Sequence, residues 1–297
     1  MRRVVHVGPT MAKGGMASVI HLLAANPPEG WRSSSCNTFS TKGLRRKMKR
    51  WRIAKKQIKN GDFDLVHIHC AAGWSYRRKL SIAKVANAPV IFHIHSGQFD
   101  IDAKSDLDEY QVVCLSEAWS EKLKHLVGDS LSVPNPVDAK LKQGVKRENF
   151  TLLMGRDDPV KGHEFSYSLG LDDLRVTGVD SAPEGVTALG WVSEEEKWNL
   201  LQTAGCLIVP SGFEGQPMVI LEALAAGCPV IASTNVPDLP ACVKTVDLGD
   251  VEAWKEAIAS PITEGLQDSV AKHQIDLVTK QWGEIYDNIM DSKASTE

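Results

Sequence analysis

The chain has 297 residues, 43% hydrophobic and 24% charged, with a net charge of −3, and is long enough for one large domain or two of about 150 residues. It contains no stretch near the roughly 18 consecutive apolar residues that a membrane-spanning helix needs, and no apolar leader of the signal-peptide kind. The six scattered cysteines form no C-x-x-C pair, which indicates free thiols in a reducing compartment. A membrane-spanning or disulfide-stabilised protein is thereby disfavoured, and we expect a cytoplasmic one.

The first half of the chain predicts strands and helices in alternation. The expected strands are residues 4–7, 33–39, 65–69, 90–94 and 112–115, and the expected helices run to about 25, from about 44, over 76–86 and from 117. Nearly continuous apolar strands separated by helical segments are typical of a parallel sheet covered on both faces. One doubly wound domain is the prediction.

The pattern stops at residues 133–149, where two prolines and a polar stretch predict a linker. It then restarts. The expected strands are 151–154, 175–177, 188–189, 207–209 and 230–231, and the expected helices are 194–203, 217–226, 252–259 and 276–289. A helix and a strand must both be compressed between Gly162 and Gly178. The sequence therefore predicts a second domain of the same kind.

The segment from Val209 to Ser233 predicts a ligand site where a strand passes into a helix. The strand ends at Val209, a loop of small residues follows, and a helix begins near Pro217. The carboxyl ends of strands in doubly wound sheets bind ligands, and a helix terminus favours an anion such as diphosphate. Glu214 in the loop and Glu222 on the second turn can accept hydrogen bonds from sugar or ribose hydroxyls. Taken alone, two such carboxylates more often only solvate a surface.

A second cluster of charge follows the strand expected at residues 151–154. Arg156 and Lys161 lie in the loop after it, where two cations can neutralise a diphosphate leaving group. An Arg and a Lys on an ordinary exposed loop are the alternative. Because the segment from Val209 to Ser233 predicts the same ligand independently, we favour the diphosphate.

Both segments resemble glycosyltransferase family 4, a two-domain retaining family with the GT-B fold. The resemblance rests on Glu214 followed after seven residues by Glu222 in a Leu-Glu-Ala run, on a Gly-Cys-Pro-Val-Ile-Ala-Ser close, and on Gly-Arg followed by Pro-Val-Lys-Gly. It implies that Glu222 binds the nucleotide ribose and Glu214 the transferred sugar. It also implies that Arg156 and Lys161 bind the diphosphate. Neighbouring positions would complete the donor site: Gly155, Gly215, Gln216, Pro217, Met218 and Val219.

Weaker resemblances to the same family extend the site. The run Leu-Gly-Trp-Val resembles the loop beside the nucleobase, so Trp191 and Val192 would hold the base, although Trp191 could equally be a core aromatic. Gly14 and Gly15 resemble a loop that faces the donor across the cleft, and a tight turn is the alternative. His95 resembles the first-domain active-site histidine that contacts the sugar.

Histidines alternate with apolar residues at the ends of two strands. His67 and His69 project on one face, as do His93 and His95, and each pair could in principle bind zinc. No cysteine or carboxylate completes a ligand set at the usual spacing, so we predict no metal site. His69 lines the acceptor side or is a packed strand-end histidine.

Positive charge is concentrated in residues 42–59, which contain ten Lys or Arg and no acidic residue. The rest of the chain carries 24 basic and 37 acidic residues. A helix there would place Leu44, Met48, Trp51 and Ile58 roughly on one face, as in helices that lie on an anionic membrane. A solvated basic helix packed by the same stripe is the alternative. Nucleic acid is not expected, because aromatic platforms and basic modules of RNA readers are missing.

The predicted architecture is α/β, with two Rossmann-like doubly wound domains facing a central cleft. Residues 1–136 would form an acceptor-side domain, residues 137–274 a nucleotide-sugar donor domain, and residues 275–297 a helix that could pack back on the first domain. The predicted activity, retaining as the resemblance implies, is transfer of a sugar from a UDP- or GDP-sugar to a hydroxyl of a glycan or membrane-associated glycolipid, with no required cofactor. The alternatives are a nucleotide-sugar epimerase or phosphorylase of the same architecture, and a non-catalytic sugar-nucleotide-binding module. Binding of the basic helix to lipid would place the protein on the inner membrane face.

Overall fold

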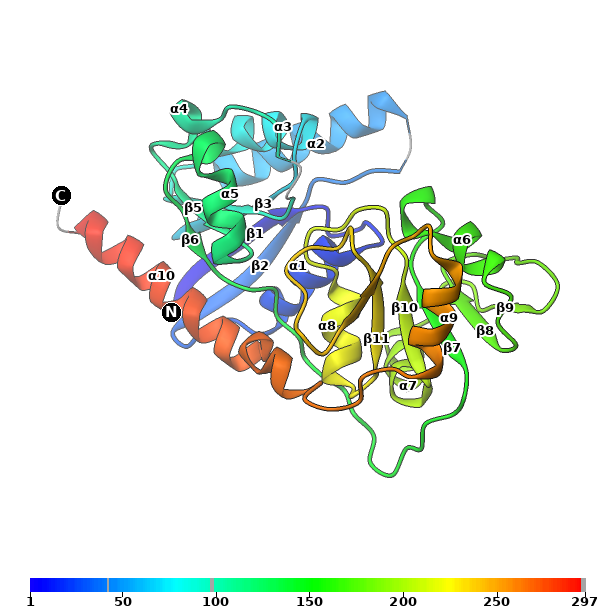
Figure 1. The fold of residues 1–297 in the computed structure, drawn as a ribbon. Coiled ribbons are helices and arrows are strands. Elements are labelled where there is room, and N and C mark those ends of the chain that lie inside the picture. Colours follow the sequence, from blue (N-terminus) through cyan, green and yellow to red (C-terminus); the bar gives the residue numbers. More distant parts are fainter. Residues whose placement is uncertain (42, 97–98, 295–297) are drawn as a thin grey trace. The chain divides into compact units, whose positions relative to one another are not determined.

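The computed structural model describes residues 1–41, 43–96 and 99–294, and the chain divides into two units (Figure 1). The first unit comprises residues 1–136 together with 273–297, and the second comprises residues 137–272. Each unit contains a six-stranded sheet flanked by helices, and its paired strands run parallel. The predicted fold class, two Rossmann-like doubly wound domains, is confirmed.

The sheet of the first unit has the strand order β2-β1-β3-β4-β5-β6. Its strands, in chain order, are β1 Arg2–Gly8, β2 Trp31–Asn37, β3 Leu65–Cys70, β4 Val90–Ile94, β5 Gln111–Cys114 and β6 Leu131–Ser132. The helices are α1 Gly15–Ala25, α2 Leu44–Asn60, α3 Trp74–Ala83, α4 Lys104–Leu107, α5 Glu117–Val127 and α10 Ile275–Ala294.

The two faces of this sheet differ in chemistry. Val5 and Val7 of β1 point into an apolar core that includes Tyr76 of α3 and Trp119 of α5. Alternation along the strand turns His6 to the opposite face, which is the face that α10 covers. The register pairs His6 with His67 and His69 with His93, so the histidines of three neighbouring strands share this face. The sheet therefore carries a polar row on its α10 side.

The second unit has the strand order β12-β11-β10-β7-β8-β9. Its strands are β7 Thr151–Met154, β8 Leu174–Thr177, β9 Val186–Ala188, β10 Cys206–Val209, β11 Val230–Ser233 and β12 Lys244–Val246. Its helices are η1 Pro159–Lys161, α6 His163–Ser168, α7 Glu194–Thr203, α8 Met218–Ala225 and α9 Val251–Ala259, and the 3-10 helix η2 Asp268–His273 leads into the first unit. The compression expected between Gly162 and Gly178 is accommodated by α6, which has only six residues.

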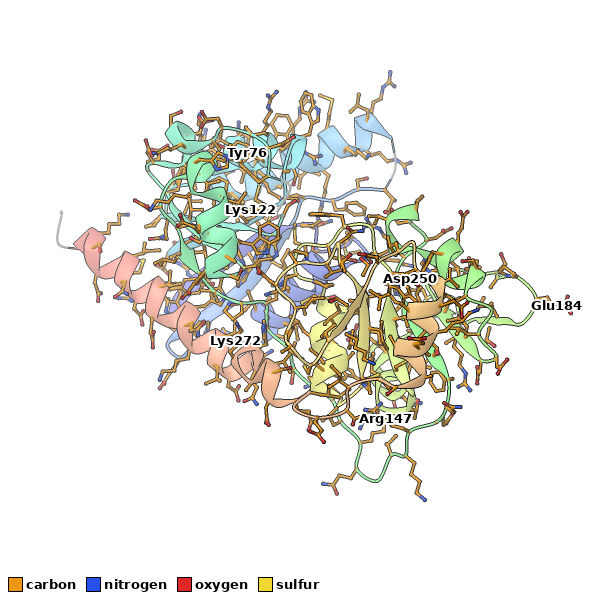
Figure 2. The ribbon with its side chains drawn as sticks, viewed as in Figure 1. Tyr76, Lys122, Arg147, Glu184, Asp250 and Lys272 are labelled. Carbon is orange, nitrogen blue, oxygen red and sulfur yellow. The ribbon has the colours of Figure 1, made fainter. Side chains whose placement is uncertain are left out.

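The polar stretch before β7 is fastened to the second unit by Arg147 (Figure 2). Its guanidinium donates to the carbonyl oxygens of Leu201 and Ala204 at the end of α7, and to that of Ala226 at the end of α8. These carbonyls at helix termini lack partners within their own helices. One side chain thus satisfies the ends of two helices.

The six cysteines are free thiols, and five of them are buried. Among the described residues, no helix combines the length and the apolar character that crossing a membrane requires.

Candidate functional site

The loops that follow β7, β8, β9 and β10 are joined at the carboxyl edge of the second unit's sheet. The amide of Gly212 donates to the carbonyl of Val160 (2.8 Å), and the amide of Gly178 donates to that of Gly190 (2.6 Å). Gly178 has φ +80°, and a Cβ there would lie 1.8 Å from the carbonyl oxygen of Gly155. Only glycine permits this approach, so the loop after β8 is packed directly under the loop after β7.

Lys161 and Glu214 meet where two of these loops converge. The Nζ of Lys161 donates to Oε1 of Glu214 at 2.5 Å, and Ser211 Oγ donates to the same oxygen at 2.9 Å. Both side chains are largely buried, with 22% and 12% exposed. Gly155 makes room for the Lys161 stem, whose Cγ lies 3.2 Å from where a Cβ would stand. The structure thus joins the two charged segments that the sequence singled out.

Arg156 has a local partner instead. Its guanidinium donates twice to Oδ2 of Asp158, at 2.8 and 3.0 Å, and its side chain is 56% exposed. The backbone N–H of Val160 and the guanidinium of Arg156 lower the pKa of Asp158. Arg156 is therefore an accessible cation held on the same loop as Lys161.

Glu222 is buried in α8 and forms an ion pair with Lys197 of α7, with Nζ and Oε1 2.7 Å apart. Lys197 also contacts the exposed Glu194 at 2.7 Å. Burial raises the pKa of Glu222, and Lys197 offsets only part of this effect. Burial acts to lower the pKa of Lys197, but Glu222 and Glu194 outweigh it and raise the pKa. Sequence reasoning missed Lys197, because nothing along the chain relates it to Glu222.

The remaining donor-site candidates of the second unit lie on the same edge. Trp191, which follows β9, is 51% exposed, so its interpretation as a core aromatic is wrong. The other candidates near α8 and β9 are half-buried or buried: Val192, Gly215, Gln216, Pro217, Met218 and Val219. Pro217 immediately precedes α8 rather than standing in its first turn.

The candidates in the first unit lie at the carboxyl ends of β1 and β4. Gly14 and Gly15 are exposed at the start of α1. Gly14 has φ 144°, and its carbonyl oxygen accepts a hydrogen bond from the amide of Ala17 at 3.0 Å. His95 directly follows β4, is half-buried, and donates its backbone N–H to the carbonyl of Cys70 at 2.7 Å.

Five histidines gather on the α10 face of the first unit's sheet: His6, His67, His69, His93 and His95. Burial lowers the pKa of His6 to about 3 and the pKa of His67, His69 and His93 well below 6.5. Burial, with a smaller effect of Lys79, lowers the pKa of His95 to about 3. Sequence reasoning missed His6, although it alternates with valines in β1 as the other histidines alternate in their strands.

The cluster contains two histidine triads, one formed by His6, His67 and His69 and the other by His69, His93 and His95. Within each triad, one nitrogen of each ring lies within 4.8 Å of the corresponding nitrogens of the other two rings. Three imidazoles are a donor set that Zn²⁺ accepts. Hydrogen bonds already join many of these nitrogens in pairs, including His6 Nδ1 with His69 Nε2 (3.1 Å) and His69 Nδ1 with His95 Nε2 (3.0 Å). A metal ion would have to break these bonds, so the arrangement favours a hydrogen-bonded row over a ligand set.

The basic segment forms α2, except for Lys42 and Gly43, and Lys42 lies outside the described residues. Ala54 and Ile58 are buried, whereas Leu44 and Met48 are 75% and 40% exposed. The apolar stripe therefore divides, with its last turns packed on the unit and its first turns in solvent. α3 lies beside α2 (Figure 1), and its first residue, Trp74, is 77% exposed.

Residues 141–264 match the protein family described as "Glycosyl transferases group 1". The chain is 27% identical over 239 residues to the "Phosphatidyl-myo-inositol mannosyltransferase" of Mycolicibacterium smegmatis, covering 67% of this chain and 60% of that protein. It is 38% identical over 80 residues to the "O-antigen chain mannosyltransferase B" of Escherichia coli, or 27% of this chain and 21% of that one. The chain thus spans less than two thirds of the length of either relative.

Two solved structures are similar over nearly the whole chain. Sucrose-phosphate synthase from Thermosynechococcus elongatus aligns with a TM-score of 0.77 at 17% identity, over 98% of this chain and 100% of its own. A glycosyltransferase involved in avilamycin A biosynthesis aligns with a TM-score of 0.67 at 18% identity, over 98% and 99%. These likenesses establish the fold.

Proposed function

Because residues 141–264 match the glycosyl transferases group 1 family and the chain has the GT-B fold, we propose that this protein transfers a sugar from a nucleotide-diphosphate sugar to a hydroxyl acceptor. The donor is a UDP- or GDP-sugar, the anomeric configuration is retained, and no cofactor is required. The observation that carries the proposal is the contact of Lys161 with Glu214, which joins a cation and a carboxylate from separate loops at the sheet edge where doubly wound domains bind ligands.

The cations Lys161 and Arg156 of the second unit stabilise the diphosphate leaving group. When the bond between sugar and diphosphate breaks, negative charge grows on the diphosphate, and nearby fixed cations lower the energy of that state. Lys161 and the accessible Arg156 lie on the same loop and supply this charge. Ser211 holds Glu214 in place, so that its carboxylate can accept hydroxyl groups of the sugar when the phosphate takes the hydrogen bonds of Lys161.

The buried pair of Glu222 and Lys197 binds the nucleotide end of the donor. Glu222 accepts the ribose hydroxyls, for which an ionised carboxylate is a stronger acceptor than a neutral one. Burial alone disfavours that ionised form, and Lys197 at 2.7 Å supports it. Trp191, half-exposed after β9, offers a flat apolar surface to the base.

The acceptor is carried by a lipid, and the first unit meets the membrane surface through α2. Exposed Leu44 and Met48 stand among exposed cations of α2, and Trp74 is exposed on the neighbouring helix. Basic helices with exposed apolar residues bind anionic bilayers, and tryptophan favours their interface. The mannosyltransferase of Mycolicibacterium smegmatis is named for a phospholipid acceptor, which supports this choice.

A donor screen tests the function. Binding of a UDP- or GDP-sugar at 100 times its Kd stabilises the protein by about 2.7 kcal/mol, which a thermal-shift assay detects. The stabilising donor is then incubated with and without glycolipid extract, and released nucleotide and glycosylated product are measured. Transfer that needs the acceptor supports the proposal. Consumption of the donor without acceptor indicates an epimerase or phosphorylase, and binding without any turnover indicates a non-catalytic module.

A further inference from the structure

Three histidines of the first unit form a row that ends at His95. His6 Nδ1 lies 3.1 Å from His69 Nε2, and His69 Nδ1 lies 3.0 Å from His95 Nε2. His6 and His69 are 1% and 0% exposed, whereas His95 is half-buried. His95 is therefore the end of the row that a ligand can reach.

The far end of the row decides the direction of its hydrogen bonds. His6 Nε2 is buried and has no hydrogen-bond partner among the described residues. A neutral imidazole carries one N–H, and if His6 carried it on Nε2, a buried N–H would stay unpaired. Unpaired buried N–H groups are rarer in proteins than unpaired acceptors. The proton therefore belongs on Nδ1 of His6, and Nε2 keeps its lone pair.

This choice propagates along the row, because each ring nitrogen that accepts a hydrogen bond forces the proton of its own ring to the other nitrogen. His6 Nδ1–H donates to His69 Nε2, so His69 is protonated on Nδ1 and donates to His95 Nε2. The proton of His95 is then on Nδ1. The only nitrogen lone pair of the neutral His95 ring, on Nε2, accepts the hydrogen bond from His69.

We propose that His6 and His69 are positioning residues that hold His95 as its Nδ1–H tautomer, so that His95 donates a hydrogen bond to an oxygen of the transferred sugar and does not act as a base. The role toward the sugar rests on the proposed function, whereas the tautomer does not. The ring stays neutral because burial lowers the pKa of His95 to about 3. A neutral donor stabilises developing charge on oxygen without exchanging a proton.

A second row in the same cluster supplies a matched control. His93 Nδ1 lies 3.3 Å from His67 Nε2, and His67 Nδ1 lies 2.7 Å from the hydroxyl of Tyr286 on α10. The ring of His93 packs against that of His95, with centroids 4.0 Å apart, but its hydrogen bond runs to His67, which does not belong to the row. Replacing His93 thus disturbs the packing of His95 and leaves the row intact.

The test reads the tautomer by NMR of protein labelled with ¹⁵N-histidine, without substrate, with the His95 resonances assigned by loss in His95→Gln. We expect a single Nδ1–H tautomer of His95 in the natural protein, in His93→Leu, and in His6→Asn, whose amide can still donate to His69. His6→Leu removes the donor, and we expect a mixture of tautomers. With the stabilising sugar nucleotide, His6→Leu should lower kcat about tenfold, the equivalent of one hydrogen bond, with KM for the donor unchanged.

An Nε2–H tautomer in the natural protein overturns the proposal, and this reading needs only the assignment variant His95→Gln to fold. So does an unchanged tautomer in His6→Leu, or an equal change in His93→Leu, which would show packing as the cause. An unchanged kcat in a His6→Leu protein with mixed tautomers overturns the role toward the sugar. If the natural protein transfers no sugar from any donor, the proposed function fails, and the tautomer still decides whether the row orders His95.

Discussion

Lys197 and Glu222, which lie on consecutive helices of the second unit, form a buried ion pair whose atoms are 2.7 Å apart, with 15% and 8% of the side chains exposed. The contact fixes α7 to α8 beside the edge where the donor is proposed to bind. An ion pair in such surroundings is costly to break from one side, because the remaining charge is left buried without a partner.

Replacing Lys197 by Met should therefore destabilise the protein by about 3 kcal/mol, since Glu222 must then be buried as an isolated charge or take up a proton. Urea unfolding at pH 7.5 measures the change. Lys255→Met is the matched control, because Lys255 pairs with Glu252 on the surface of α9 at 3.0 Å. The control should cost under about 1 kcal/mol. Equal costs for the two variants would contradict the importance of the buried pair.

Lys161→Ala should weaken the binding of UDP or GDP about 10- to 100-fold, because one charge-assisted hydrogen bond to phosphate is lost. Titration calorimetry measures the affinity. Lys142→Ala removes an exposed lysine of the same unit that is paired with Glu195 at 2.8 Å, and it should bind the nucleotide as the natural protein does. If Lys161→Ala binds as tightly as Lys142→Ala, the diphosphate lies elsewhere.

Gly178→Ala should destabilise the second unit by roughly 3 kcal/mol, because the new Cβ adds a clash with the carbonyl of Gly155 to an unfavourable φ. Gly185 offers a control, since it has φ +84° and nothing within 4 Å of a Cβ. Its replacement by Ala should cost only roughly 1 kcal/mol, from the backbone alone. Thermal and urea unfolding compare the two, and similar losses would mean that the loops after β7 and β8 can separate freely.

Because of its five-histidine cluster, we expect the first unit to lose stability at acidic pH. The folded-state pKa of each of its five members lies below the unfolded value of about 6.5, so stability is full above that pH and declines as the pH falls below it. In this pH window, each buried neutral histidine lowers the free energy of unfolding by about 1.4 kcal/mol for each pH unit of acidification.

Urea unfolding between pH 7.5 and pH 5 measures that slope. His6→Leu should reduce it by the share of one histidine. A stability that does not change between pH 7 and pH 5 would contradict burial of neutral rings.

Charge reversal on α2 should release the protein from anionic vesicles. The double variant Lys47→Glu and Lys49→Glu changes two exposed cations, and binding measured by flotation at low salt should fall at least tenfold, at about 1 kcal/mol per lysine. Lys122→Glu with Lys124→Glu makes the same change of net charge on exposed positions of α5 and should retain binding. Failure of the natural protein to float with anionic lipid would remove the membrane from the proposal.

Most of the fold could be predicted from the sequence, because buried parallel strands are short apolar runs between helical segments. β4, β7 and α7 have the predicted bounds, and α2 and α5 begin where predicted. β6 and β12 were missed, since edge strands of two and three residues containing Ser, Lys or Thr lack an apolar run. α4 was missed because four residues are too few for a helical period.

The candidate site was predictable in part, for a different reason. Glu214 and Lys161 stand in recognisable local segments, but their partners depend on how distant loops fold together. Lys197 and His6 contribute through contacts across helices or strands, and no spacing along the chain encodes such contacts. The roles assigned to the site residues stay predictions until the variants above are measured.

The first unit is assembled from two distant stretches of chain, because α10 contributes Trp282 and Tyr286 to the histidine face of its sheet. During synthesis on the ribosome, residues 137–272 emerge as one continuous piece and can fold as soon as they leave the exit tunnel. The sheet that contains β1 must wait for α10 before its polar face is covered, so the second unit, which is made between them, can be completed before the first.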